Sequence, residues 1–186
     1  MISGQTNEQQ SAEQLAQRLS KAADHEEIRQ VVYRYCRGID RRKFELVRNC
    51  YHPDGTDDHG DYRGGIDGFI DYVTKGLSIW QTTTHFIGNV GIESTGDSAR
   101  VESYGVATHR RGVTGERPAL DFVAGIRYVD DFERRNGIWL IATRVCLIDW
   151  TRTDLVEGKG WTRPLEYTQP SPDGNDPVFA PSLRNL

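Results

Sequence analysis

The spacing of apolar residues changes once along this sequence, near residue 82, and this change constrains the fold more than any other feature. Before it, apolar residues recur at helical spacing. After it, they alternate or gather in β-branched runs. Helices are expected at residues 24–40, 43–51 and 66–75, and strands at residues 83–92, 100–111, 120–134 and 138–150. Helices followed by strands predict an α+β fold, in which the helices cover one face of a curved antiparallel sheet.

The segment that follows residue 23 has the clearest helical pattern. Asp24 is a candidate N-cap, and Glu27 stands three residues later, which is the spacing of a capping box. One face of this helix then carries Ile28, Val31, Val32, Tyr35, Cys36 and Ile39. We therefore expect the helix to begin at Asp24 and to end near Gly38 or Asp40. A frayed polar tail with a short helix at residues 11–22 is expected before it.

Turn signals divide the rest of the chain. Asn136-Gly137 lies between two strand-like runs and is the strongest short-range signal for a β-hairpin. The polar stretch at residues 52–65 is expected to be a solvated turn with one short strand at residues 56–62. The chain then consists of a polar N-terminal extension (residues 1–23), one α+β domain (residues 24–157) and an irregular, Pro-rich C-terminal tail (residues 158–186).

Charge and composition exclude several classes of protein. The 186 residues include 23 Lys+Arg and 27 Asp+Glu, for a net charge of −4, which argues against binding to nucleic acid or to an anionic membrane surface. No apolar run approaches the roughly 18–20 residues of a membrane-spanning helix, and the first ten residues contain no apolar signal-peptide stretch. Three cysteines fit neither a disulfide framework nor a zinc site. We expect a soluble, cytoplasmic protein.

Two polar residues stand where the pattern expects apolar ones. Asp40 continues the apolar face of the first clear helix, and His85 lies within a β-branched run. Taken singly, Asp40 is most simply a residue of a helix end and His85 a hydrogen-bonded core residue. If the two meet, the carboxylate fixes the imidazole tautomer and leaves the other ring nitrogen as a general base.

Arg144 and Tyr35 are the next candidates. Arg144 has the same strand parity as its apolar neighbours, so it is expected to point inward and to need an anionic partner. One reading is a structural ion pair with an Asp of the helical layer. Tyr35 lies on the apolar helix face, where it either packs in the core or donates its phenol hydrogen to a substrate.

Motifs for other chemistries are missing from the sequence. Residues 52–61 are rich in Asp and His, but they lack the spacing of a calcium loop or of a helical zinc motif. There is no glycine-rich phosphate loop, no Gly-x-Ser-x-Gly elbow and no Cys–His arrangement with a compelling spacing. Hydride transfer and serine hydrolysis are therefore disfavoured, and no metal and no cofactor is expected.

Several segments together resemble a known family. The segments are residues 28–40, 51–55, 62–69, 84–89 and 132–139. Over residues 24–152 the chain resembles the SnoaL-like branch of the nuclear transport factor two-like superfamily, whose members include dehydrochlorinases and dehydratases. The resemblance implies a cone-shaped α+β barrel around a deep pocket. It also implies that Asp40 and His85 form a catalytic dyad, with Tyr35 and Arg144 at two further active-site positions.

The resemblance implies a cofactor-independent lyase. His85 would remove a proton from a hydrophobic, aromatic or polycyclic small molecule, and Asp40 would orient it. Tyr35 and Arg144 would polarise or protonate the leaving group, which could be water, halide or formaldehyde. The expected substrate-binding residues are Tyr51, Phe69, Trp80, Tyr104, Phe122 and Trp161, the last as a lid residue or an oligomer contact.

Two alternatives remain open at this stage. An isomerase or cyclase acting through an enolate would use the same base without losing a leaving group. A non-catalytic ligand-binding or assembly module, similar to the small subunit of ring-hydroxylating dioxygenases, would need no base at all. An open curved sheet also leaves an apolar outer face that needs cover, so a homo-oligomer is expected, either a trimer or a dimer.

Overall fold

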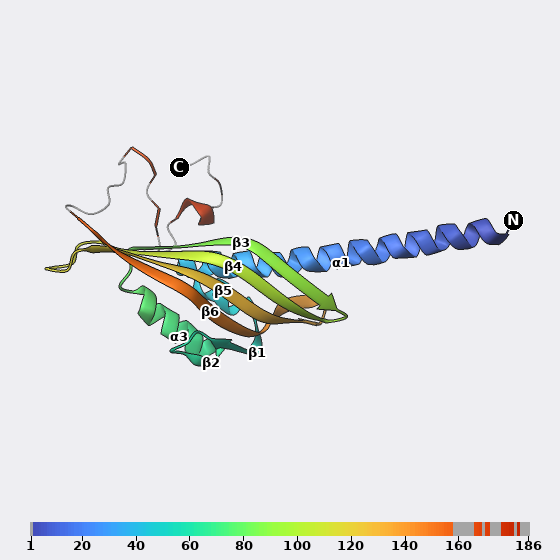
Figure 1. Ribbon diagram of the computed structural model, residues 1–186, viewed down its shortest axis with the longest axis horizontal. Coiled ribbons are helices and arrows are strands. Elements are labelled where there is room, and N and C mark those ends of the chain that lie inside the picture. The colour runs from blue at the N-terminus through green and yellow to red at the C-terminus, as the bar shows by residue number, and fades with distance from the viewer. Residues whose placement is uncertain (1, 158–165, 169, 172–175, 181, 183–186) are drawn as a thin grey trace.

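The computed structural model describes residues 2–157, 166–168, 170–171, 176–180 and 182 (Figure 1). Its helices are α1 (Ile2–Asp40), α2 (Phe44–Arg48), α3 (Ile66–Leu77) and the short 3-10 helix η1 (Pro177–Phe179). Its strands are β1 (Tyr51–Asp58), β2 (Arg63–Gly65), β3 (Thr82–Thr95), β4 (Ser98–Arg111), β5 (Ala119–Arg135) and β6 (Ile138–Val156). This arrangement confirms the predicted α+β class, and the helices that were expected to precede the long strands do so.

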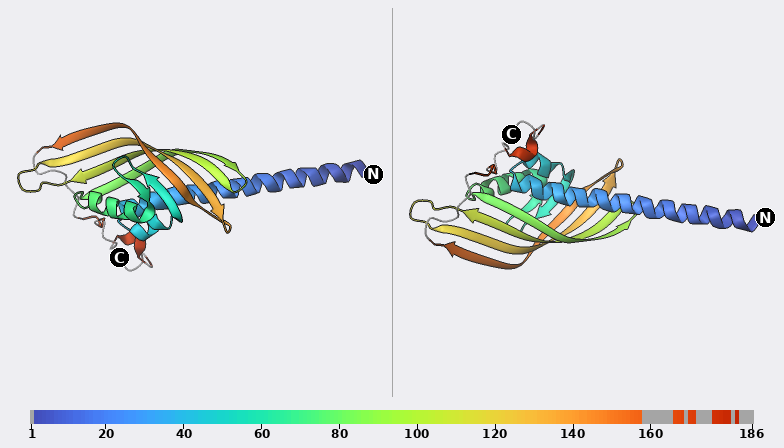
Figure 2. Two further views of the ribbon diagram at one scale, coloured as in Figure 1. Left: turned by 90° about the horizontal axis from the view of Figure 1, so that it is seen from below. Right: turned by 90° about the horizontal axis from the view of Figure 1, so that it is seen from above.

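The six strands form one curved, unclosed sheet in the order β2-β1-β6-β5-β4-β3 (Figures 1 and 2). Strands β3 to β6 are an antiparallel meander, as expected. Strand β1 also pairs with β2 in antiparallel fashion, whereas β1 pairs with β6 in parallel. A parallel pair needs a long crossover connection, and α3 with the meander supplies it. This pairing places Asp57 beside Arg144, although 87 residues separate them in the chain.

The predicted hairpin joins β5 to β6. Arg135 pairs with Ile138 across the turn, and the two turn residues have positive φ angles of 53° at Asn136 and 79° at Gly137. Two successive positive φ angles suit a two-residue turn that matches the twist of the flanking strands. The Asn-Gly signal therefore identified both the turn and its register.

Helix α1 is longer than the sequence predicts. It runs for 39 residues through Asp24 without a break, so Asp24 is not its N-cap. Residues 5–37 contain neither glycine nor proline and are rich in good helix formers, which favours one continuous helix. The Asp24 carboxylate instead accepts hydrogen bonds from Arg134 at 2.8 Å and from the indole of Trp139 at 3.0 Å. Its role is to fasten α1 to the β5–β6 hairpin.

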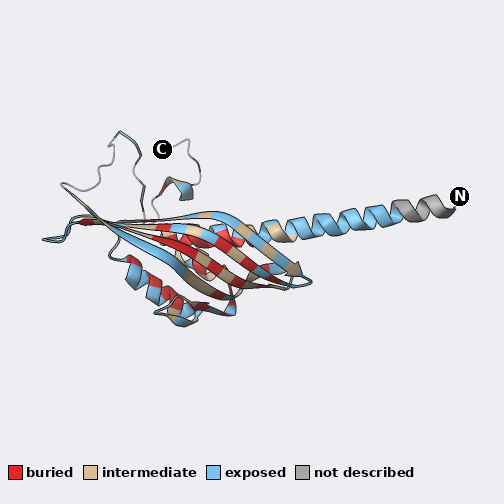
Figure 3. Cartoon of the chain, viewed as in Figure 1, coloured by how far each residue is buried: buried red, intermediate tan, exposed pale blue. Residues whose placement is uncertain are grey.

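The two halves of α1 differ in burial (Figure 3). Residues 9–23 are exposed, and the N-terminal half of the helix projects beyond the end of the sheet. The C-terminal half buries the predicted apolar face, namely Ile28, Val31, Val32, Tyr35, Cys36 and Ile39. Among the described residues, no helix is both long and apolar enough to span a membrane.

Candidate active site

Asp40 and His85 are in direct contact. The Nδ1 atom of His85 lies 2.7 Å from one oxygen of the Asp40 carboxylate, and the backbone N–H of His85 donates to the other oxygen at 2.9 Å. Because an ionised carboxylate can only accept, the ring proton belongs on Nδ1 and the lone pair on Nε2. The two side chains are 13% and 8% exposed, respectively, so the pair is largely shielded from water.

The fold positions this pair from two elements. Asp40 is the last residue of α1, and His85 lies on β3, the edge strand against which α1 packs. Arg42 follows the helix with a positive φ of 52° and donates to the backbone carbonyls of Leu77 and Trp80. These bonds tie the end of α1 to the segment that leads into β3, and so fix the carboxylate relative to the imidazole.

A second histidine that the sequence reasoning missed lies beside the pair. The rings of His85 and His109 are 5.8 Å apart, centroid to centroid, in an edge-to-face arrangement. Burial, and then the charge of His85, lower the pKa of His109 to about 4, so it is neutral at pH 7. The strand pattern did offer a signal, because His109 has the same parity as buried Ala107, the register partner of His85.

Two of the predicted substrate-binding residues lie next to His109. The ring of Trp80 is 5.4 Å from that of His109, and the ring of Phe122 is 6.0 Å from it. Trp80 and Phe122 also stack on each other at 6.2 Å. All three side chains are only partly buried. They form an aromatic wall beside His85.

A cleft of about 320 Å³ opens at Asp40 and His85, between α1 and β3. Cys36 and Phe86 also line it, together with Val178 from η1. The η1 segment is held there by the Phe179 ring, which the guanidinium of Arg37 approaches at 5.0 Å. The cleft is therefore a mixed surface, in which a carboxylate, an imidazole and the side chains of Arg37 and Arg41 lie among apolar groups.

Arg144 and Tyr35 belong to a different cluster. Arg144 is fully buried and forms two parallel hydrogen bonds to Asp130, at 2.6 and 2.7 Å. Its guanidinium lies 4.1 Å from the ring centroids of both Tyr35 and Tyr128, and these two rings meet edge to face at 5.6 Å. The expected carboxylate partner is thus present, but it comes from β5 and not from the helical layer.

The structure does not join this cluster to the dyad by a polar contact. In the part of the chain that it describes, neither Tyr35 nor Arg144 makes a hydrogen bond to Asp40 or His85. Burial raises the pKa of Tyr35 well above its ordinary value, so its phenol stays protonated. The four predicted catalytic residues therefore form two separate pairs, Asp40 with His85 and Tyr35 with Arg144. In each pair one residue comes from α1 and the other from the sheet.

The remaining predicted substrate-binding residues separate in space. Phe69 is fully buried and stacks on Tyr35 at 6.4 Å, and Tyr51 lies in the same aromatic core. The expectation that Tyr104 faces the interior is wrong. It is 41% exposed on the outer face, under the guanidinium of Arg127, because its strand neighbour Ser103 takes the inward position. Trp161 lies outside the described residues.

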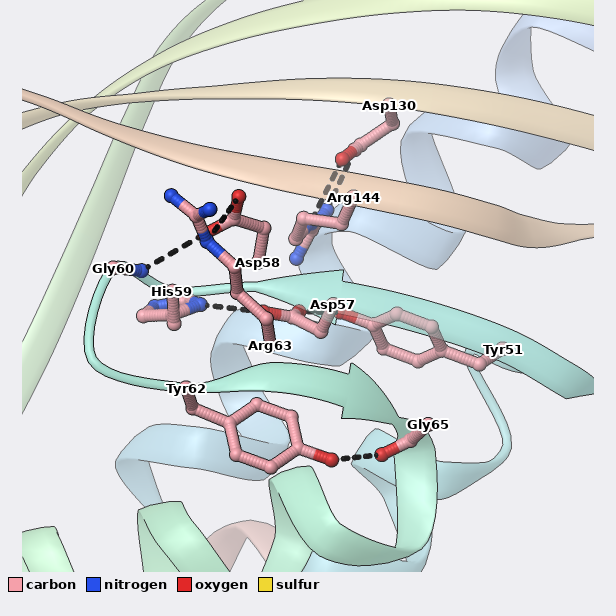
Figure 4. Close-up of polar contacts among 10 residues, drawn as sticks. All are labelled: Tyr51, Asp57, Asp58, His59, Gly60, Tyr62, Arg63, Gly65, Asp130 and Arg144. Carbon is pink, nitrogen blue, oxygen red and sulfur yellow. Dashed lines mark hydrogen bonds and ion pairs between the residues drawn. The ribbon is translucent and has the colours of Figure 1, made fainter.

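The polar stretch after Tyr51 is not the solvated turn that the sequence predicts. Residues 51–58 form β1, and Asp57 is only 1% exposed. Asp57 accepts hydrogen bonds from the phenol of Tyr51 at 2.5 Å and from Nδ1 of His59 at 2.8 Å (Figure 4). Pairing with β6 turns these side chains inward, and periodicity could not show this because polar residues fill both faces of the segment.

Comparison with known proteins is consistent with this fold. The profile of the SnoaL-like domain family matches residues 20–145. An uncharacterized protein of Mycobacterium bovis is 30% identical over 133 residues, which cover 68% of this chain and 86% of that protein. An uncharacterized protein of Mycobacterium tuberculosis matches to the same extent.

Two solved structures share the architecture. The hexachlorocyclohexane dehydrochlorinase LinA-type3 from Novosphingobium barchaimii has a TM-score of 0.67 at 18% identity, over 78% of this chain and 99% of that chain. A candidate scytalone dehydratase from Novosphingobium aromaticivorans has a TM-score of 0.64 at 20% identity, over 80% of this chain and 97% of that chain. At these identities the likeness is one of fold.

Proposed function

This chain belongs to the SnoaL-like domain family, and on that premise we propose that it is a cofactor-independent lyase acting on a hydrophobic small molecule. His85 acts as the general base, and Asp40 orients it and stabilises the imidazolium that forms. The observation that carries the proposal is the double contact of Asp40 with His85, which leaves Nε2 as the basic ring nitrogen. The dehydrochlorinase and dehydratase names among the structural neighbours agree with elimination chemistry.

The substrate proposed for this site is aromatic or polycyclic. The support is the partly buried wall of Trp80, His109 and Phe122 beside His85, since small-molecule sites combine apolar walls with a few polar groups. The leaving group would be water, halide or formaldehyde. A role for Tyr35 and Arg144 in protonating or polarising that group stays a prediction, which Tyr35→Phe tests without removing the ring.

The experiment is a panel of aromatic and steroid-like alcohols and halides, followed by mass spectrometry. A lyase product lacks the mass of water, hydrogen halide or formaldehyde, whereas an isomerase or cyclase product keeps the substrate mass. His85→Gln and Asp40→Asn should each lower kcat by at least about a hundredfold. His25→Gln is the matched control, because His25 also joins α1 to β3, through Ser94, but lies in neither cluster.

Two outcomes would contradict the proposal. Turnover near the wild-type rate in either variant would exclude a working Asp40–His85 dyad. Ligand binding without turnover of any compound, together with a co-purifying partner chain, would favour the assembly-module alternative. The expected homo-oligomer also stays a prediction, and sedimentation velocity distinguishes a trimer or dimer from a monomer.

A further inference from the structure

The parallel pairing of β1 with β6 brings a histidine next to a cysteine. Asp57 pairs with Arg144, and Asp58 pairs with Val145. One further step along both strands places His59 beside Cys146, on the inward face that already holds Asp57 and Arg144. The contacts agree, because the His59 ring is 6.3 Å from that of Tyr128, and Tyr128 is the register partner of Cys146 on β5.

Hydrogen bonds hold the His59 ring in one orientation. Its Nδ1 atom donates to Asp57 at 2.8 Å, and the phenol of Tyr51 donates to the other oxygen of the same carboxylate (Figure 4). The second ring nitrogen, Nε2, is then the one left to face the Cys146 thiol. The order of the three groups is that of a thiol–imidazole–carboxylate triad.

We propose that Cys146, His59 and Asp57 form a nucleophilic thiol site that takes electrophilic carbonyl compounds, with α,β-unsaturated carbonyls as the class. The Cys146 sulfur is the nucleophile, His59 accepts its proton, and Asp57 is a positioning residue that orients the imidazole. This site does not include the Asp40–His85 pair, and its thiol chemistry does not require His85. It shares only Arg144 with the residues proposed for the lyase.

The addition balances without any further reagent. The thiol proton resides on Nε2 of His59, and the sulfur, as the thiolate, forms a bond to the β-carbon of the unsaturated carbonyl compound. The carbon–carbon π bond breaks, and its electron pair passes to the α-carbon through the enolate. His59 then returns the proton to the α-carbon, which leaves a saturated thioether on Cys146.

A neighbouring group is suited to bind the carbonyl oxygen. Arg144 is fully buried, and its Nη1 atom finds no hydrogen-bond partner among the described residues, although its other nitrogens bind Asp130. A buried donor without an acceptor lowers stability, so a ligand oxygen that accepts a hydrogen bond from Nη1 would remove this cost. Arg144 lies next to Asp57 in the register, within the same cluster as the thiol.

Electrostatics support the same assignment. Burial alone would lower the pKa of His59, but the hydrogen bond that its ring donates to Asp57, together with the neighbouring Cys146, outweighs burial and raises the pKa to about 9. An imidazole that is cationic at pH 7 stabilises a neighbouring thiolate. The charged and titratable groups around it are Asp57, Asp61, Arg144, Cys146, Tyr35, Tyr51, Tyr72 and Tyr128.

The other two cysteines provide internal controls. Cys36 is 5% exposed, and burial raises the pKa of its thiol to about 12. Cys50 is fully buried, and burial raises the pKa of its thiol as well. Cys146, in contrast, is partly exposed to solvent. A thiol reagent should therefore discriminate among the three within the folded protein.

The test is modification of the full-length protein by N-ethylmaleimide, an α,β-unsaturated carbonyl compound, with peptide mapping by mass spectrometry. At pH 7 Cys146 should react first, and His59→Gln should slow its reaction about tenfold, because an ordinary thiol is only a few per cent thiolate at that pH. Asp57→Asn should slow it less. His52→Gln is the matched control on β1, since the His52 ring hydrogen-bonds to the Glu133 backbone carbonyl and not to Asp57.

The outcomes that would overturn the proposal are equally defined. They are equal rates in the wild type and in His59→Gln, or modification of Cys36 or Cys50 before Cys146. If His59→Gln does not fold, the pH–rate profile of the wild type decides alone: an apparent thiol pKa at or above about 8.5 would contradict activation. His85→Gln should keep the fast reaction, which separates this site from the proposed lyase site.

Discussion

His85 binds both oxygens of the Asp40 carboxylate, one through Nδ1 at 2.7 Å and the other through its own backbone N–H at 2.9 Å. The side chain and the main chain of one β3 residue therefore share a single partner at the end of α1. This arrangement sets both the position of the ring and the atom that carries its proton. It also determines how the site should respond when asparagine replaces Asp40.

Asp40→Asn is predicted to reverse the His85 tautomer. The backbone N–H still needs an acceptor, so the amide oxygen takes that place and the NH₂ group faces Nδ1. A ring nitrogen that faces a donor must be unprotonated, so the proton moves to Nε2 and the base is lost. Long-range ¹H–¹⁵N spectra of the neutral imidazole report which nitrogen carries the proton.

The control for this experiment is His25, which contacts Ser94 and lies apart from the dyad. Its imidazole signals should be the same in the wild type and in Asp40→Asn. An unchanged His85 tautomer in the variant would mean that Asp40 does not determine the protonated nitrogen. Its role would then be limited to holding the strand.

A second prediction concerns the β5–β6 hairpin. Gly137→Ala forces a side chain into a φ of 79° and should lower the free energy of unfolding by about 1 kcal/mol or more. Gly76→Ala is the matched control, because Gly76 lies inside α3 and a Cβ there meets nothing within 4 Å. That change should be neutral or should stabilise by about 0.5–1 kcal/mol. Urea denaturation measures both, and equal effects would contradict the turn assignment.

Local patterns in the sequence were enough to predict much of this fold. The helical face of residues 28–39, the helix at Ile66 and the Asn136-Gly137 turn each depend on neighbours in the chain, and each is confirmed. The contact of Asp40 with His85 could be predicted because both residues interrupt an apolar pattern. The length of α1 could not be predicted, since the capping-box pattern at Asp24 resembles a helix N-terminus even within a longer helix.

Partners that depend on strand pairing could not be predicted. Sequence spacing could not show that β1·β6 pairing brings His59 towards Cys146, because the two residues are 87 positions apart in the chain. Strand parity placed Arg144 inward, but register alone identifies Asp130 on β5 as its partner. The inward position expected for Tyr104 was wrong for a related reason, because residue type does not show which face of a strand a side chain occupies.

His109 should make the protein less stable at mildly acid pH. Burial, and then the charge of His85, lower its pKa in the folded state to about 4 from its ordinary value of 6.5. Above pH 6.5 the ring is neutral in both the folded and the unfolded states. As the pH falls from 6.5 to 4, only the unfolded state binds the proton, so the free energy of unfolding decreases over this range.

The loss from His109 should reach about 3 kcal/mol at pH 4, from a shift of about 2.5 units. Equilibrium denaturation between pH 4 and pH 7.5 measures it in the wild type and in His109→Gln, which cannot titrate. The free energy of unfolding should fall more steeply in the wild type. Parallel curves for the two proteins would contradict a buried neutral His109.

The last prediction concerns the buried Arg144–Asp130 pair. Both side chains are 0% exposed, so removing one charge leaves the other buried without its partner. Arg144→Met should therefore lower the free energy of unfolding by about 3–5 kcal/mol. It also removes the guanidinium that lies 4.1 Å from the Tyr35 and Tyr128 rings. Asp130→Asn should be destabilising as well.

A double-mutant cycle separates the pair from the loss of packing. If the charges act as a unit, Arg144→Met with Asp130→Leu should be less destabilised than the sum of the single variants, because no unpaired charge remains buried. Arg127→Met is the exposed control. Its bridge to Asp149 is solvated, so screening should make the effect on stability small. Urea unfolding of all variants gives the coupling, and additive effects at Arg144 and Asp130 would show that the two charges do not depend on each other.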